Sequence, residues 1–140
     1  MNQSGNEILS RRTLADDERV DFVHALFGLN FPFRLEPSVF SMADRLAENY
    51  NGGYWQFYAL GNGGFYMAPD VDHDYRVVCE NGFEGALSSD AFGITACLYA
   101  YSQLSFGVGA FAETCAEQYH LLREYAMDHP EVGAILAAID

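Results

Sequence analysis

The sequence predicts a single α+β domain, in which a small antiparallel β-meander of three or four strands packs with about five helices. Two apolar runs, Tyr54–Leu60 and Phe65–Ala68, flank the turn segment Gly61–Gly64. An Asn-Gly pair between such runs is the strongest short-range signal of a β-hairpin, because a type I′ turn needs positive φ at both central residues. Segments with helical spacing of apolar residues lie on both sides of this hairpin. The expected order of elements is therefore ααββ(β)ααα, which is typical of an α+β fold.

The expected hairpin is apolar on both faces. If Asn62 and Gly63 form the loop, Leu60 lies opposite Phe65 and Tyr58 lies opposite Met67. Large apolar patches are rarely left bare on a monomer, so we expect helices to cover both faces of the hairpin. The alternative is that one aromatic face stays open to a partner, with Tyr54 or Trp55 as the natural contact.

The chain before the hairpin divides into a polar arm and two helices. Residues 1–12 are expected to be flexible, and residues 13–140 to form the folded domain. Thr13 is expected to cap a helix that ends near Phe27, and Pro37 to be the first residue of a second helix. The expected buried stripe of the first helix is Val20, Val23 and Phe27.

The chain after the hairpin is expected to contain a third strand, a short fourth strand and three helices. Tyr75–Glu80 alternates in the manner of a strand, and Phe83–Leu87 returns after the second Asn-Gly turn. The segment 90–106 is apolar on most sides, which predicts a buried central helix packed on the sheet. Helices at 112–128 and 131–139 complete the domain.

Composition restricts the classes of function. Twenty acidic residues against seven basic ones give a formal charge of −13, and every base is Arg. Such a surface repels phosphate backbones, so we expect no direct binding of nucleic acid. The absence of Lys excludes a Walker A loop and any lysine nucleophile. No apolar run approaches the ~18 residues of a membrane span, and no signal peptide is recognisable. The three cysteines indicate free thiols. We therefore expect a cytoplasmic location.

An acidic loop follows the hairpin. Asp70, Asp72 and Asp74 resemble the opening of a calcium-binding loop, with acids at positions one, three and five. Position six should be Gly and is Tyr75, while position twelve should be Glu and is Asn81. We therefore interpret the segment as a solvated turn and expect neither a metal site nor a cofactor.

The helix at 112–128 carries a narrow acidic stripe. At ~100° per residue the stripe opposes the apolar face of the helix, and its members are Glu113, Glu117, His120, Glu124 and Asp128. One interpretation is a DNA mimic, in which carboxylates replace phosphates. However, a stripe of ~22 Å corresponds to ~13 phosphate charges of duplex DNA. Four carboxylates reproduce less than a third of that charge, so an ordinary solvated helix face is the favoured interpretation.

Enzymatic signals are weak. The chain has no Gly-x-Ser-x-Gly elbow, and no Cys or His lies in a recognisable nucleophile setting. His73, between Asp72 and Asp74, is the only cluster of a histidine with carboxylates that the sequence reveals. We expect no catalytic residues; an enzyme of unknown chemistry that uses this cluster remains an alternative.

The segment Asn49–Pro69 also carries a family resemblance. Its strings NGGYW-x-FY and NGGFYMAP resemble the signature of the KlcA/ArdB family of antirestriction proteins from plasmids and genomic islands. The resemblance continues through RVVCENGFEGALSSDAFGI and EQYHLLREYAMDHPEVGAILAAID, so it extends from about Arg19 to Asp140. One departure is Gly61, where the family pattern has Ser.

The resemblance implies a non-enzymatic cytoplasmic protein that relieves type I DNA restriction and so protects incoming mobile DNA. Its implied partner is the type I restriction-modification complex or an associated host protein. A direct DNA mimic that competes for the DNA-binding site of the restriction enzyme is the alternative mechanism. The candidate interaction surface comprises Asp70, Asp72, Asp74, Glu113, Glu117, Glu124, Asp128, Tyr54 and Trp55.

Overall fold

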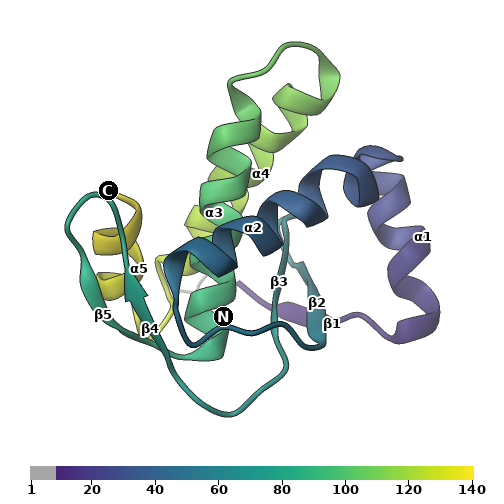
Figure 1. Cartoon of the computed structure of the whole chain (residues 1–140). Coiled ribbons are helices and arrows are strands. Elements are labelled where there is room, and N and C mark those ends of the chain that lie inside the picture. The colour runs from purple at the N-terminus through teal and green to yellow at the C-terminus, as the bar shows by residue number, and fades with distance from the viewer. Residues whose placement is uncertain (1–8) are drawn as a thin grey trace, which may run out of the picture.

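The computed structural model describes residues 9–140 and confirms the α+β class (Figure 1). Its helices are α1 (Asp16–Phe27), η2, which is a π-helix (Phe31–Leu35), α2 (Glu36–Leu46), α3 (Ser89–Ser105), α4 (Ala110–Ala126) and α5 (Val132–Ile139). Its strands are β1 (Arg11–Thr13), β2 (Trp55–Leu60), β3 (Phe65–Pro69), β4 (Tyr75–Val78) and β5 (Glu84–Leu87).

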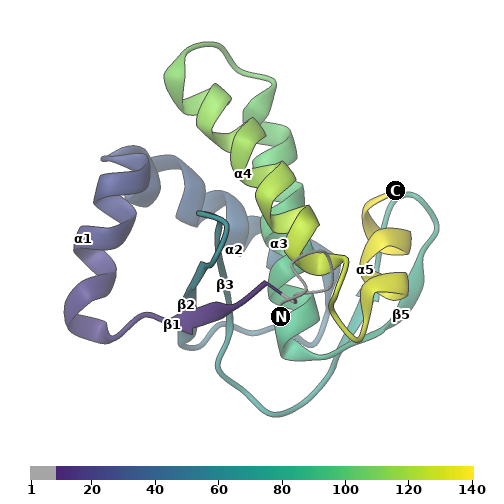
Figure 2. The ribbon, with the colours of Figure 1, turned by 180° about the vertical axis from the view of Figure 1, so that it is seen from behind.

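The helices surround two small sheets. Helices α3 and α4 pack side by side, and the loop that joins them projects away from both sheets (Figures 1 and 2). Helix α1 lies on one side of the molecule, and α5 lies with β4 and β5 on the opposite side (Figures 1 and 2). No helix between residues 9 and 140 is long and apolar enough to cross a membrane.

The strands do not form the single meander that the sequence suggests. Strands β1, β2 and β3 form one antiparallel sheet, and β4 and β5 form a separate antiparallel pair. Strand β1 pairs with the outer edge of β2, with Arg11 opposite Leu60 and Thr13 opposite Tyr58. The expectation of a flexible arm through residue 12 is therefore wrong for Arg11 and Arg12, because the free edge of β2 binds them. Residues 1–8 of that arm lie outside the described residues.

The hairpin between β2 and β3 has a longer loop than predicted. The N–H of Leu60 donates to the carbonyl of Gly64 at 2.9 Å, and the N–H of Gly63 donates to the carbonyl of Leu60 at 3.0 Å. The loop thus contains three residues, with Gly63 at a φ of 93°. A three-residue loop ends in a residue with positive φ, which Gly adopts without a steric penalty.

This loop shifts the register by one residue and corrects the predicted pairing. Tyr58 lies opposite Tyr66, not Met67, and Ala59, not Leu60, lies opposite Phe65. A shift of one residue moves every side chain of a strand to the other face. As a result Tyr58 stacks on Tyr66 with 4.8 Å between ring centroids. On the other face, the ring of Phe65 joins the aromatic core.

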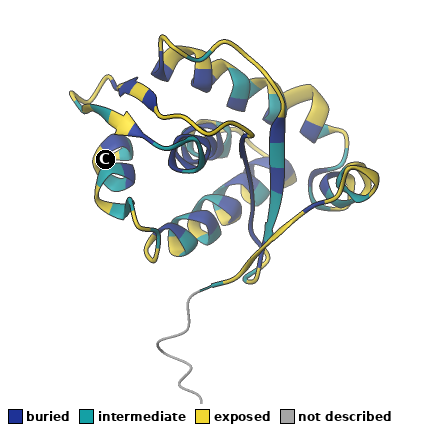
Figure 3. Cartoon of the chain, turned by 90° about the horizontal axis from the view of Figure 1, so that it is seen from below, coloured by how far each residue is buried: buried dark blue, intermediate teal, exposed yellow. Residues whose placement is uncertain are grey.

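Both faces of β3 are covered, as we expected, whereas β2 is only half-buried at Gln56, Tyr58 and Ala59. All five residues of β3 are buried (Figure 3). Helix α3 is the central helix, and its contact with β3 leaves no room for a side chain at Gly93. A Cβ atom there would lie 2.4 Å from the Cβ of Ala68 and 2.5 Å from the carbonyl oxygen of Met67. Two turns further on, the hydroxyl of Tyr101 donates to the carbonyl of Phe65 at 2.8 Å.

The first helix begins later than predicted. Thr13 belongs to β1, so it does not cap α1; Ala15 occupies the N-cap position, and its N–H donates to the carboxylate of Glu18 at 2.8 Å. Val20, which we expected in the core, is 72% exposed, whereas Val23 and Phe27 are buried. The helix therefore contacts the body along a narrower stripe than its apolar pattern suggests.

The second helix is preceded by a π-turn. Helix α2 follows η2 directly, and the N–H of Glu36 donates to the carbonyl of Phe31, five residues earlier. Pro37 has no N–H, and its ring clashes with the carbonyl four residues earlier in a regular α-helix. The wider π geometry is compatible with a proline at this place in the chain. Pro37 thus lies in the first turn of α2, which confirms the prediction to within one residue, and η2 precedes this turn without a break.

We predict that Gly93→Ala lowers the free energy of unfolding by about 2–3 kcal/mol, because the added methyl group overfills the contact between α3 and β3. The matched control is Gly133→Ala in α5, where a Cβ meets nothing within 4 Å. That variant should be neutral or stabilising by up to about 1 kcal/mol. Urea denaturation of the three proteins measures both effects. Equal stability of Gly93→Ala and the wild type would contradict the close contact.

Candidate functional site

The acidic loop between β3 and β4 is exposed. Asp70, Asp72 and Asp74 are all open to solvent. The ring of His73 packs against Tyr75 at 4.9 Å, and its Nδ1 lies 3.1 Å from the carbonyl oxygen of Asp74. Neither neighbouring carboxylate forms an ion pair with His73. Across residues 9–140, no three His, Cys, Asp or Glu side chains are placed to hold a metal ion.

The acidic stripe of α4 is shorter than predicted. Helix α4 ends at Ala126, so Asp128 lies beyond the helix. The remaining carboxylates, Glu113, Glu117 and Glu124, are exposed. The carboxylate of Glu124 accepts a hydrogen bond of 2.8 Å from the amide of Asn62 in the hairpin loop. The helical part of the stripe thus has three carboxylates over ~16 Å, where duplex DNA carries ~10 charges.

The two aromatic candidates have different environments. Trp55 is only 2% exposed, and Phe40 of α2 packs against its ring with 5.3 Å between centroids. The expectation that Trp55 lies on an interaction surface is therefore wrong, because α2 covers this face of the hairpin. Tyr54 is 50% exposed, but its hydroxyl donates to Asp16 and accepts from Arg19.

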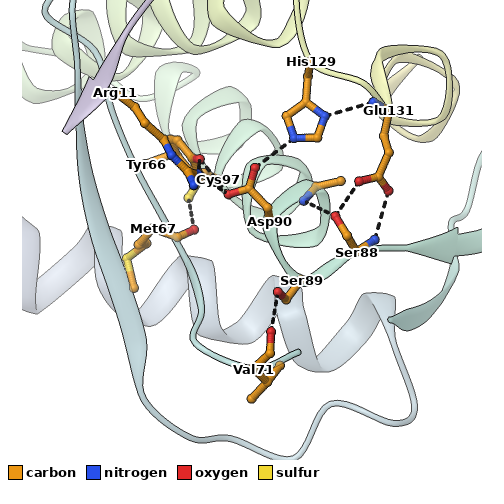
Figure 4. A network of polar contacts seen from close by, with 11 residues as sticks. Arg11, Tyr66, Met67, Val71, Ser88, Ser89, Asp90, Cys97, His129 and Glu131 are labelled. Carbon is orange, nitrogen blue, oxygen red and sulfur yellow. Dashed lines mark hydrogen bonds and ion pairs between the residues drawn. The ribbon is translucent and has the colours of Figure 1, made fainter. Parts of the chain in front are cut away.

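The structure brings together a polar cluster that the sequence did not reveal (Figure 4). Its centre is Asp90, in the first turn of α3. One carboxylate oxygen accepts hydrogen bonds from Arg11 and from the hydroxyl of Tyr66, both at 2.7 Å. The other oxygen lies 2.8 Å from Nε2 of His129. The cluster thus connects β1, β3 and the α4–α5 loop to the start of α3.

A second set of bonds holds the same helix end. Ser88 is the N-cap of α3, and its Oγ accepts the N–H of Ala91 at 3.1 Å. The Ser88 hydroxyl donates to the carboxylate of Glu131, which also accepts the Ser88 N–H at 3.0 Å. Glu131 lies in the α4–α5 loop beside His129 (Figure 4). The loop is therefore fixed to α3 at two adjacent points.

The electrostatics of the cluster keep Asp90 ionised. Partial burial by itself raises the pKa of the Asp90 carboxyl, but hydrogen bonds from His129 and Tyr66 and the charge of Arg11 outweigh it. The pKa of Asp90 therefore lies below its ordinary value. Burial, together with the adjacent Asp90 carboxylate, raises the pKa of Tyr66, so its hydroxyl stays protonated and donates.

The histidine in this cluster is not arranged as a general base. The N–H of Glu131 donates to Nδ1 of His129 at 3.0 Å, so that nitrogen carries no proton and Nε2–H donates to Asp90. Both ring nitrogens are thereby occupied, and neither can take a proton from a nucleophile. The geometry supports a role in holding the fold together.

The cysteines also lack the properties of nucleophiles. All three are free and buried. Burial raises the pKa of Cys97 to about 12 and that of Cys115 to about 11, and it also raises the pKa of Cys79. A thiol is a nucleophile only as the thiolate, so these side chains are inert near neutral pH.

Comparison with known proteins identifies relatives of the whole chain. A family model described as "Antirestriction protein" matches residues 48–140. The antirestriction protein KlcA of Escherichia coli is 42% identical over 130 residues, which cover 91% of this chain and 92% of KlcA. The uncharacterised protein YafX of Escherichia coli strain K12 is 45% identical over 130 residues, which cover 89% of this chain and 84% of YafX.

A solved structure matches over the entire chain. The TM-score is 0.89 at 41% identity, and the alignment covers 100% of both chains. That structure comes from work on KlcA and ArdB, which reports a novel fold and antirestriction activity against type I DNA restriction systems in vivo but not in vitro.

We predict that Asp90→Asn lowers the free energy of unfolding by about 2 kcal/mol at neutral pH, because charge-assisted hydrogen bonds to Asp90 are weakened. Since the pKa of Asp90 is lower in the folded protein than its ordinary value of 3.8, this stabilisation is present above about pH 4 and is lost as the pH falls through the folded-state pKa. Denaturant titrations at several pH values should show that the difference in free energy of unfolding between the wild type and Asp90→Asn narrows below about pH 4.

Asp128→Asn is the matched control, because Asp128 is exposed and lies outside the cluster. It should leave the stability unchanged at every pH. If the difference in free energy of unfolding between Asp90→Asn and the wild type stays constant down to acid pH, the ionised Asp90 carboxylate does not have the stabilising role assigned to it.

Proposed function

Since this chain belongs to the antirestriction protein family, we propose that it relieves type I DNA restriction in the cell and so protects incoming mobile DNA. The observation that carries this proposal is the match over the full length to a structure from work on KlcA and ArdB. At 41% identity and a TM-score of 0.89, fold and sequence agree along the entire chain. The proposed place of action is the cytoplasm, where type I enzymes meet incoming DNA.

The proposed mechanism is non-enzymatic and uses protein contacts. Work on KlcA and ArdB reports activity in vivo but not in vitro, which favours a route that needs a cellular component besides the purified restriction enzyme. The site geometry agrees with this view, because the ring nitrogens of His129 are occupied and the thiols are protonated. The proposed partner is the type I complex or a host protein associated with it.

The competing mechanism is direct mimicry of DNA. It requires a dense array of carboxylates that matches phosphate spacing. Helix α4 offers three exposed carboxylates over ~16 Å, less than a third of the duplex charge of that length. The loop acids from Asp70 to Asp74 lie outside this helix and do not lengthen the stripe. Charge density therefore supports protein contacts over mimicry.

We predict that expression of this protein restores plating of unmodified phage on a host with an active type I system. The relief should be specific, so plating on a host with a type II enzyme should not change. An empty vector is the control for both hosts. Unchanged plating on the type I host, with the protein shown to be soluble and folded, would refute the proposed function.

We predict that the triple variant Glu113→Gln, Glu117→Gln and Glu124→Gln retains antirestriction, because the stripe is too sparse to replace DNA. Any complex that the wild-type protein forms with a purified type I enzyme should also form with the triple variant at low salt, where charge attraction is strongest. A salt-sensitive complex that the triple variant cannot form would support mimicry instead. Thermal unfolding of the variant controls for its fold.

A further inference from the structure

An apolar groove lies between α1 and the segment that contains η2 and the start of α2. Helices α1 and α2 are connected through η2, and from this connection they run in different directions (Figure 1). The groove has a volume of about 350 Å³. Most of its lining is apolar, from Val20, Val23, Leu29, Phe31, Pro32 and Phe57. This volume is near the lower end of ligand sites, which suits one or two side chains better than a large cofactor.

The rim of the groove exposes apolar side chains that contribute little to the fold. Val20 is 72% exposed and Leu29 is 63% exposed. Val20 continues the apolar stripe of α1, yet it faces the groove and not the core. Exposed apolar residues that gather around one concave site are typical of a binding surface.

Arg19, a charged residue that lines the groove, is fully engaged in contacts within the protein. The guanidinium of Arg19 lies 3.6 Å from the ring centre of Phe57 and donates to the carbonyl of Trp55 at 3.0 Å. It also donates to the hydroxyl of Tyr54. Arg19 is thus bound within the protein and forms part of the groove floor.

Glu36 is the other charged residue of the groove lining, and its side chain has no partner within residues 9–140. Glu36 is of intermediate burial and therefore keeps contact with solvent. Partial burial raises the pKa of Glu36, although the charge of Arg19 opposes this shift. A carboxylate that is half-buried without a partner gains stability when a cation binds to it. The groove thus combines apolar walls with one free acceptor for a positive charge.

We propose that this groove is the docking site for a segment of a partner protein that carries an apolar side chain next to a Lys or Arg. The apolar side chain enters the groove, and the cation pairs with Glu36. The chain's formal charge of −13 attracts such a segment at long range. The inference rests on the proposed function, since the groove would be the contact through which a non-enzymatic antirestriction protein acts.

The projecting loop between α3 and α4 of a second copy fits the groove less well. The most exposed apolar residues are Phe106 and Val108, at 85% and 97%, in the projecting loop between α3 and α4. No Lys or Arg lies between Arg76 and Arg123 in the sequence, so this loop brings no cation beside its apolar residues. Two copies also repel each other through their net charge.

The first test uses phage plating with three variants. Leu29→Asp and Glu36→Gln should each reduce the restored plating by about tenfold or more, because they remove the apolar and the charged contact. Val108→Asp is the matched control, an exposed apolar residue outside the groove, and should plate like the wild type. All three should unfold at the wild-type temperature. Groove variants that plate like the wild type would overturn the inference and leave the proposed function intact.

The second test does not depend on antirestriction. A short synthetic peptide with Leu between two Arg residues should shift the amide NMR signals of Gly28 and Leu29. The same peptide with Glu in place of Arg should cause no shift, and Glu36→Gln should weaken binding of the Arg peptide. The absence of shifts with the Arg peptide would overturn the groove as a docking site, even if the wild type restores plating.

Sedimentation tests whether a second copy of this chain occupies the groove. The wild type should sediment as a monomer at all concentrations tested. A dimer that dissociates in Leu29→Asp would assign the groove to a second copy and overturn the inference. If the wild type fails to restore plating, the proposed function fails, and the groove is then judged by the peptide titration alone.

Discussion

The contact between Gly93 and β3 is the constraint on which the rest of the structure depends. Because no side chain separates them, the backbone of α3 lies directly on Met67 and Ala68. This proximity places Asp90, one turn earlier, within hydrogen-bond distance of Tyr66. A larger residue at position 93 would move the helix outward and break that bond. The packing of an apolar helix thereby determines the position of a polar cluster.

The cluster around Asp90 in turn holds β1 and the α4–α5 loop to the start of α3. Strand β1 is three residues long and exposed, so its pairing with β2 gives modest stability by itself. The ion pair of Arg11 with Asp90 ties this strand to α3, and His129 and Glu131 tie the α4–α5 loop to the same helix end. Within residues 9–140 no buried side-chain nitrogen or oxygen lacks a hydrogen-bond partner, which is the condition under which a half-buried polar network stabilises a fold.

Elements with a strong local signal could be predicted from sequence, and those set by distant contacts could not. The apolar segment 90–106 and the Asn-Gly pair correctly indicated α3 and a hairpin. The register was wrong because Gly61–Gly64 permits a loop of two or three residues, and local rules favour the shorter one. Strand β1 consists of Arg11, Arg12 and Thr13, which carry no strand pattern. Asp90 and His129 are 39 residues apart, so no spacing rule connects them.

The acidic surface could likewise be predicted from the sequence, whereas the groove could not. Charge is visible in the composition, but it is spread over the molecule, and its long-range field raises the rate of encounter more than the affinity. The groove was invisible, because Val20 continues an apolar stripe that sequence assigns to the core. Both mimicry and docking of a basic segment weaken with salt, so salt dependence alone does not separate them. They differ in the apolar contact: a DNA mimic has no need of Leu29, whereas a docked side chain loses its pocket when Leu29 becomes Asp.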